Sequence, residues 1–325
     1  MCLKAVKISL ARARIQHEVI VVDDGSSDGT PQSVISASKN WDSRGVLKLV
    51  KHRTSQGPAA ARNSGVKIAR GAILLFTDSD CLPSPQWVKE LTDVFINKPA
   101  CDMAEGQTQA FPNPPYSINA HVVENRRGGR WLTCNLAVRR KAFIQAGGFD
   151  ERYRHPVRED TDFAFAVLSL GGKPVFNPRA IVRHPVKQGK PGMVLGQAWQ
   201  AKYDPLLFLK YPLLYLTRLK WIDGWFFPVY HLGFYAATGW LLVSTASPDQ
   251  LSSNSLMVMG GIVLASLGAT ILARLRRRKF EPRLLPIVAL ESLIAPFTRL
   301  WWTLYGFIWA SASLIKDGTY GLLRR

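Results

Sequence analysis

Two aspartates separated by one residue, Asp78 and Asp80, give this chain its clearest capacity for chemistry. They follow the apolar run 72–76, which has the length of a short buried strand, so both carboxylates are expected at the carboxyl edge of a sheet. Carboxylate oxygens are ligands that Mg²⁺ and Mn²⁺ prefer, together with water and phosphate. The same spacing is also typical of a turn followed by a helix cap. The pair therefore indicates a metal site only within a supporting context.

Two upstream segments supply that context. Residues 18–30 read as a buried β-branched strand, an Asp-Asp-Gly turn at 23–25 and the start of a helix. Residues 54–71 read as a Gly-Pro entry, an Ala-rich helix and a glycine stop before the next strand. Ligands of open α/β sheets bind outside the carboxyl ends of the strands. We therefore expect the acidic turn at 23–25 and the pair Asp78 and Asp80 to face one crevice, with Arg62 toward a diphosphate.

In order and spacing, these segments resemble glycosyltransferase family 2, whose members bind nucleotide sugars on a GT-A fold. The resemblance covers about residues 1 to 190, and the matching residues are Val22-Asp23-Asp24-Gly25-Ser26-Ser27-Asp28, the helix from Gly57 to Gly71, Asp78-Ser79-Asp80, Gly147-Gly148-Phe149-Asp150-Glu151 and Glu159-Asp160-Thr161-Asp162-Phe163. It implies an α/β fold with a Rossmann-related mixed sheet flanked by helices. It also implies a nucleotide-sugar donor and Mg²⁺ or Mn²⁺ as cofactor.

The resemblance further implies roles for individual side chains. Asp24 would read the nucleobase, and Asp160 would be the catalytic base with Glu159 beside it. The expected nucleotide-binding residues are Asp23, Asp24, Gly25, Arg62, Asp78 and Ser79, and the expected metal ligands are Asp78, Asp80 and His184. Asn135 is expected on the acceptor side.

These roles are chemically coherent for an inverting sugar transfer. Such a reaction needs a carboxylate that takes the proton of the acceptor hydroxyl and a cation that stabilises the departing diphosphate. Structural interpretations stay open beside the catalytic ones. Residues 159–162 also suit the acidic first turn of a helix, an isolated His184 is usually structural, and Asn135 equally suits a buried, hydrogen-bonded amide.

The start of the chain departs from the family. Members normally begin with a strand ending in a Pro-x-Tyr-Asn-like segment that forms part of the nucleobase pocket, whereas residues 1–6 read as the helix that follows it. We therefore expect the first strand to be missing. Losing a buried strand would expose two neighbouring edges of the sheet, so a misassigned or truncated start is favoured over a natural variant.

The C-terminal third has the composition of a membrane protein. Residues 224–248 and 250–273 contain no Asp, Glu, Lys or Arg, and each stretch exceeds the roughly 20 residues that span a bilayer as a helix. A third apolar region, 284–315, is interrupted by charged residues and a proline and is expected to be a tilted helix or an interfacial hairpin. We expect two or three transmembrane helices within residues 224–325.

The distribution of charge predicts orientation and partners. The chain carries a formal net charge of +19, and a basic cluster at 274–279 follows the second apolar stretch. By the positive-inside rule this cluster and the catalytic domain lie on the cytoplasmic side of the inner membrane. Residues 191–223 form a basic amphipathic connector that is expected on anionic membrane lipids. Nucleic acid is not an expected partner, because the charge is spread along the chain and peaks beside apolar segments.

The sequence thus predicts a membrane-anchored, metal-dependent inverting glycosyltransferase with its catalytic domain in residues 1–190. The expected acceptor is a cell-surface glycan or a polyprenyl-linked one. Single-sugar transfer is favoured over polymerisation, because residues 196–200 lack the Arg-Trp pair of the processive family members. Two alternatives stay open: a nucleotidyltransferase on a similar fold, and an inactive membrane-anchored relative that acts as a scaffold.

Overall fold

The computed structural model describes residues 1–39, 41, 45–190, 192–219, 232–246, 252–275 and 281–317 of the chain. The chain forms two compact units, Met1–Pro112 with Val122–Val186 and Asn113–His121 with Lys187–Arg325. The sequence did not predict that residues 113–121 group with the second unit. The division into domains at residues 190 and 223 stays a prediction.

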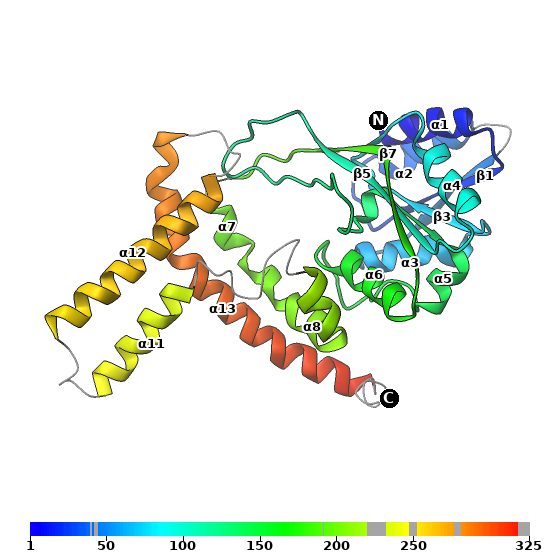
Figure 1. The fold of residues 1–325 in the computed structure, drawn as a ribbon. Coiled ribbons are helices and arrows are strands. Elements are labelled where there is room, and N and C mark those ends of the chain that lie inside the picture. Colours follow the sequence, from blue (N-terminus) through cyan, green and yellow to red (C-terminus); the bar gives the residue numbers. More distant parts are fainter. Residues whose placement is uncertain are drawn as a thin grey trace. The chain divides into compact units, whose positions relative to one another are not determined.

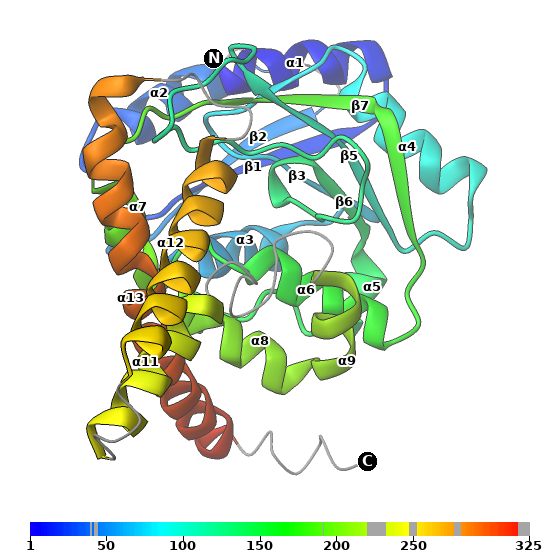
Figure 2. The ribbon, with the colours of Figure 1, turned by 60° about the vertical axis from the view of Figure 1, so that its left-hand side comes forward.

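The first unit alternates helices and strands. Its helices are α1 (Cys2–Ala13), α2 (Thr30–Ser38), α3 (Pro58–Ile68), α4 (Trp87–Asn97), α5 (Arg140–Gln145) and α6 (Glu159–Ser169). Its strands are β1 (His17–Asp23), β2 (Gly45–Lys51), β3 (Ile73–Phe76), β4 (Leu82–Pro83), β5 (Met103–Phe111), β6 (Leu136–Arg139) and β7 (Pro174–Pro185). Figures 1 and 2 show α1, α2 and α4 on one face of the strands and α3, α5 and α6 on the other. The predicted fold class, a mixed sheet flanked by helices, is confirmed.

The strands form two sheets. β1 and β2 are parallel, with His17 opposite Gly45 and Asp23 opposite Lys51. The second sheet has the order β3-β6-β5-β7-β4, and β5 and β7 are its parallel pair. Within the described ranges no strand joins β1 to β3. The register of β1 and β2 places the residues that follow these two strands side by side at one sheet edge.

Local sequence explains how two helices are placed. α3 begins at Pro58 directly after Gly57, whose φ of 98° favours glycine and whose missing side chain avoids a clash with the Arg154 carbonyl. α4 buries Trp87, Val88, Leu91, Val94 and Phe95 along one face, which is the spacing of an amphipathic helix. These side chains join α1 and the strands of the second sheet in one buried core.

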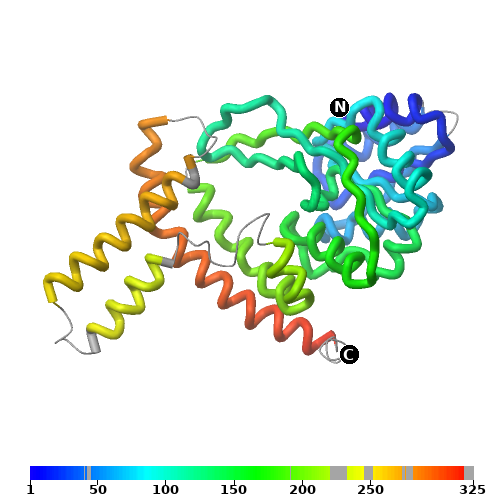
Figure 3. Tube along the Cα trace, viewed as in Figure 1, coloured from blue at the N-terminus to red at the C-terminus, as the bar shows by residue number. Residues whose placement is uncertain are grey.

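The second unit is helical. Its elements are α7 (Met193–Gly196), a 3₁₀ turn (Ala198–Tyr203), α8 (Asp204–Lys210), α9 (Pro212–Leu214), α11 (Leu232–Ala246), α12 (Ser253–Leu275) and α13 (Leu285–Lys316). α11 and α12 run side by side (Figure 3). In the described part of the chain, two helical segments are long and apolar enough to cross a membrane, Ser253–Leu272 and Pro282–Lys316.

Of the two alternatives for the third apolar region, a tilted helix or a hairpin, the structure has a helix and no hairpin turn between residues 285 and 316. This helix, α13, is continuous and passes through Pro296. The predicted aromatic entry of the first span, at 225–227, and most of the basic cluster, 276–279, lie outside the described residues.

Candidate active site

Side chains that could hold a metal ion converge beside the end of β3. Asp78 and Asp80 follow β3, and His184 lies near the end of β7. The ligand atoms of these residues and of Cys81 all lie within 4.8 Å of one another. The structure thus brings together the three predicted metal ligands and adds a thiol that was not among them.

The donor set fits a divalent cation. The two carboxylates are oxygen donors that Mn²⁺ and Mg²⁺ prefer, the imidazole adds a nitrogen donor that suits a transition metal such as Mn²⁺ better than Mg²⁺, and the exposed Asp80 leaves room for water and phosphate oxygens. His184 Nδ1 lies 3.0 Å from the Pro185 carbonyl oxygen, so donation there leaves the Nε2 lone pair for a metal.

We call Asp78, Asp80, Cys81 and His184 the metal cluster. Arg62 on α3 connects this group of side chains to the start of α6. Its Nη2 lies 3.1 Å from Asp78 Oδ1, and its Nη1 lies 2.9 Å from Glu159 Oε1. The guanidinium also lies over the Phe149 ring, 5.6 Å from its centroid. Burial alone would lower the pKa of Arg62, but Asp78 and Glu159 outweigh this effect and raise it. Arg62 is therefore a permanent cation that holds two carboxylates near each other.

Glu159 and Asp160 open α6 in different environments. Glu159 is only 3% exposed, and burial together with the Asp160 charge raises its pKa to about 7 despite Arg62. Asp160 is half-buried, and its Oδ1 accepts the N–H of Thr161 at 2.7 Å. The preceding Arg158 has a φ of 70°, a strained conformation for a residue with a side chain. Asp160 is thus the more accessible of the two predicted catalytic carboxylates.

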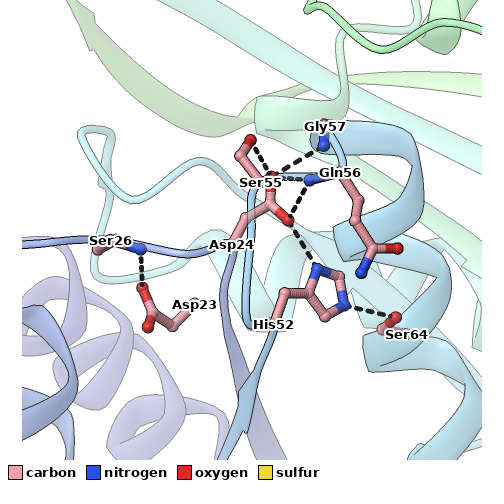
Figure 4. A network of polar contacts seen from close by, with 8 residues as sticks. All are labelled: Asp23, Asp24, Ser26, His52, Ser55, Gln56, Gly57 and Ser64. Carbon is pink, nitrogen blue, oxygen red and sulfur yellow. Dashed lines mark hydrogen bonds and ion pairs between the residues drawn. The ribbon is translucent and has the colours of Figure 1, made fainter.

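Asp24 fixes the loop before α3, as Figure 4 shows. Its carboxylate accepts hydrogen bonds from Ser55 Oγ at 2.8 Å, the Gln56 N–H at 2.9 Å and the Gly57 N–H at 2.8 Å. Burial alone would raise the pKa of Asp24, but these bonds and one from His52 lower it to about 2. The carboxylate that the sequence assigned to the nucleobase therefore also has a structural function.

His52 was missed by the sequence reasoning. Its Nδ1 lies 2.6 Å from Asp24 Oδ1, and its Nε2 lies 2.9 Å from Ser64 Oγ on α3. It follows β2 just as Asp24 follows β1, and the two strands pair in parallel with Asp23 opposite Lys51. A signal was therefore present, because residues after neighbouring parallel strands meet at the same edge.

The other predicted nucleotide-binding residues lie in two turns. Asp23 is buried and accepts the Ser26 N–H at 3.2 Å. Gly25 has a φ of 79°, and a Cβ there would lie 2.8 Å from the Ser55 nitrogen, so the close approach of the two loops requires glycine. Ser79 is exposed between the two aspartates of the metal cluster.

Asn135 is buried in the core, at 1% exposure, in the 3₁₀ turn that precedes β6. Its Oδ1 accepts the Trp87 Nε1–H at 2.8 Å, and its Nδ2 donates to the carbonyls of Gln107 at 3.0 Å and Ala180 at 2.9 Å. This is the buried, hydrogen-bonded alternative that the sequence left open beside an acceptor role.

Glu105 on β5 is a second residue that the sequence reasoning missed. It is buried, and its carboxylate accepts bonds from Asn125 Nδ2 at 2.7 Å, the Trp131 N–H at 2.8 Å and the Gly129 N–H. Burial raises its pKa. The available signal was that Glu105 is the one charged residue of β5, and its function is to hold the segment that leads into Asn135.

The sequence of this chain is similar to those of known proteins. Residues 2–144 match the family model described as Glycosyl transferase family 2. The glycosyltransferase AglE of Haloferax volcanii is 36% identical over 113 residues, which are 34% of this chain and 36% of that protein. The succinoglycan biosynthesis protein ExoO of Rhizobium meliloti is 33% identical over 211 residues, which are 59% of each chain. The chain thus spans less than two thirds of the length of these relatives.

A solved structure has the same fold. The mannosyltransferase PcManGT from Pyrobaculum calidifontis, determined in complex with GDP-Man and Mn²⁺, superposes with a TM-score of 0.50 at 18% identity. The match covers 87% of this chain and 78% of that one. At this level of identity the likeness concerns the fold alone.

Proposed function

We propose, from the match of residues 2–144 to the family model described as Glycosyl transferase family 2, that the protein transfers a sugar from a nucleotide-sugar donor to a glycan or lipid-linked acceptor. One observation carries the proposal. Arg62 contacts both Asp78 of the metal cluster and Glu159, the neighbour of Asp160. A diphosphate bound at the metal cluster and an acceptor hydroxyl near Asp160 would therefore share one site.

In the proposed reaction, Asp160 takes the proton of the acceptor hydroxyl. The hydroxyl oxygen then bonds to the anomeric carbon of the donor sugar from the face opposite the diphosphate. The bond between that carbon and the diphosphate oxygen breaks, its electron pair stays on the nucleoside diphosphate, and the configuration inverts. A divalent cation held by Asp78, Asp80 and His184 would supply Lewis acidity toward the departing diphosphate.

The remaining site residues hold the metal ligands and the proposed base in position. Arg62 keeps Asp78 in place and pairs with the buried Glu159, so the half-buried Asp160 is the member of the acidic pair that an acceptor hydroxyl can reach. Asp24 and His52 hold the loop that precedes α3 and thus the helix that carries Arg62. The solved mannosyltransferase contains GDP-Man and Mn²⁺, which belong to the donor and metal classes proposed here.

The apolar helices support anchoring in a membrane. We place the catalytic unit on the cytoplasmic side of the inner membrane, because the basic cluster at 274–279 follows α12 and basic residues flank spans on that side. A lipid-linked acceptor would then meet the enzyme at the membrane surface.

The proposal is tested with the full-length protein in lipid nanodiscs, incubated with Mn²⁺, a panel of nucleotide sugars and a polyprenyl-linked acceptor. We expect release of a nucleoside diphosphate with one donor. Release of pyrophosphate would instead identify a nucleotidyltransferase. No release with any donor, together with no binding of UDP or GDP in the presence of Mn²⁺, would favour a scaffold.

A further inference from the structure

We propose that the second half of α13, from Arg299 to Lys316, lies along the membrane surface with one apolar face in the lipid instead of crossing the bilayer. The inference rests on the membrane anchoring proposed above but not on sugar transfer. It assigns a lipid-binding surface to a helix whose composition alone would suit a span.

This half of α13 has two distinct faces. Its exposed face is formed by large apolar and aromatic side chains, namely Trp301, Leu304, Tyr305, Ile308 and Ile315. Ile308 is 73% exposed and Trp301 67%. The opposite face is buried and consists mainly of small side chains, namely Thr303, Gly306, Ala310 and Leu314. A helix that crosses a bilayer on its own has no need of such a division.

The buried face packs against one part of the connector 191–223, namely the 3₁₀ turn Ala198–Tyr203 and α8. Tyr203 and Trp309 meet edge to face, with ring centroids 5.7 Å apart. Gly306 lies so close to the Lys202 backbone that a Cβ would clash with the Lys202 carbonyl. The connector therefore follows α13 along this half at close range.

The contact between Asp204 and Arg299 holds one end of this packing. Arg299 Nη2 lies 3.3 Å from Asp204 Oδ2, and the Asp204 side chain is only 4% exposed. Arg299 is one of the charged residues that interrupt the third apolar region, and in the structure it pairs with Asp204 of the connector.

The free-energy cost of placing charges and irregular backbone in the hydrocarbon core argues against a transmembrane position for this half of α13. If it crossed the hydrocarbon core, the connector packed along it would enter the core too, with Lys202, Asp204 and Lys210. Each charge at the bilayer centre costs at least about 2.5 kcal/mol, and lipid-exposed irregular backbone is not tolerated there. At the interface the same groups remain in water and headgroups.

The aromatic residues agree with an interfacial position. Trp and Tyr gather at membrane–water interfaces, so a span carries them near its two ends. Here Trp301 and Trp302 lie at the start of the segment, but Tyr305 and Trp309 continue the aromatic series into its interior. Exposed basic side chains in the same unit, Arg218 and Lys316, suit anionic headgroups, and α12 provides a neighbouring candidate span.

The test measures the depth of single spin labels in the full-length protein in nanodiscs of anionic lipid. Single cysteines replace Trp301, Leu304, Ile308 and Ile315 in a Cys2→Ser background, in which the remaining three thiols are buried. Accessibility to oxygen and to a nickel chelate gives each depth. We expect all four labels to lie at one shallow depth within a few ångströms.

A matched set on α12 serves as control. Met257, Leu264 and Leu272 are about as exposed as the α13 positions and lie on a candidate span. Leu264 should be markedly deeper than the other two, because each residue of a spanning helix adds about 1.5 Å along its axis.

Two outcomes would overturn the inference. If Ile308 lies roughly 10 Å deeper than Trp301 and Ile315, as seven residues of an upright helix require, α13 crosses the membrane. If the α12 control shows no label within lipid, the membrane anchoring itself is wrong and the inference fails with it. Neither result depends on sugar transfer, which is measured separately by nucleoside diphosphate release.

Discussion

Arg62 donates from Nη1 to Oε1 of Glu159 across 2.9 Å, although the two residues are 97 positions apart in the chain. The same guanidinium reaches Asp78 at 3.1 Å. Through Arg62, helix α3 thus connects the turn after β3 to the first residue of α6. This contact brings the turn that carries Asp78 next to Glu159, the neighbour of the predicted base Asp160.

Removing the Arg62 cation should lower the stability of the folded protein. In Arg62→Met, Glu159 stays buried without its partner and takes up a proton, because its pKa is already about 7 beside Arg62; the loss of unfolding free energy should therefore stay below the roughly 3 to 5 kcal/mol of a buried charge left without a partner. The thermal melting temperature should fall by several degrees. The double variant Arg62→Met/Glu159→Gln should recover part of this loss, since the buried carboxyl group that lost its partner is replaced by a neutral amide. A single variant that melts like the wild type would show that the ion pair does not support the site.

Asp160 should affect the chemical step without affecting donor binding. Asp160→Asn removes the proton acceptor, so turnover should fall by about 10² to 10⁴ while the Kd for the nucleotide sugar stays nearly constant. Asp93→Asn, a change on the half-exposed surface of α4, is the control and should leave both quantities unchanged. Robust turnover by Asp160→Asn would remove this residue from the mechanism.

Asp24 should make the fold sensitive to acid. Its pKa is lowered to about 2 from 3.8, so the native state binds this proton less readily than the unfolded chain. The stabilisation is therefore complete above about pH 4 and is lost as the pH falls toward 2; it amounts to about 2 kcal/mol. Melting curves between pH 2.5 and 6 should show a smaller acid-dependent decrease for Asp24→Asn than for the wild type. Identical pH profiles would contradict the hydrogen-bond assignment.

The metal cluster should bind Mn²⁺ through Asp80 and His184. Loss of either ligand should weaken binding by at least the roughly 10-fold that outer-shell partners typically contribute. Titration of free Mn²⁺ by electron paramagnetic resonance, without any donor, measures this directly for Asp80→Ala and His184→Ala. Asp28→Asn, an exposed change outside the cluster, is the control. Unchanged Mn²⁺ affinity in both ligand variants would place the metal elsewhere.

Local patterns predicted the elements that carry the site. The β-branched run before Asp23, the Gly57-Pro58 entry to α3 and the apolar run before Asp78 each lie where the structure has a strand or helix. These features depend on residues within a few positions of one another, so a single sequence is sufficient to detect them.

Contacts between distant segments could not be read in the same way. The pairing of Arg62 with Glu159 and the three hydrogen bonds of Asn135 depend on side-chain directions that only the packed fold determines. His52 was an intermediate case, because strand pairing would have placed it beside Asp24. The continuity of α13 through Pro296 was likewise hidden, since a proline normally ends or kinks a helix and packing must compensate for it.

The most direct test of the central claim is calorimetric binding of UDP and GDP to the full-length protein with and without Mn²⁺. If the acids around Asp78 hold a metal and a diphosphate together, at least one nucleotide binds only with Mn²⁺. Asp80→Ala then abolishes binding, and Asp160→Asn retains it. Nucleotide binding that is equally strong without a divalent cation, or that survives Asp80→Ala, would contradict the account.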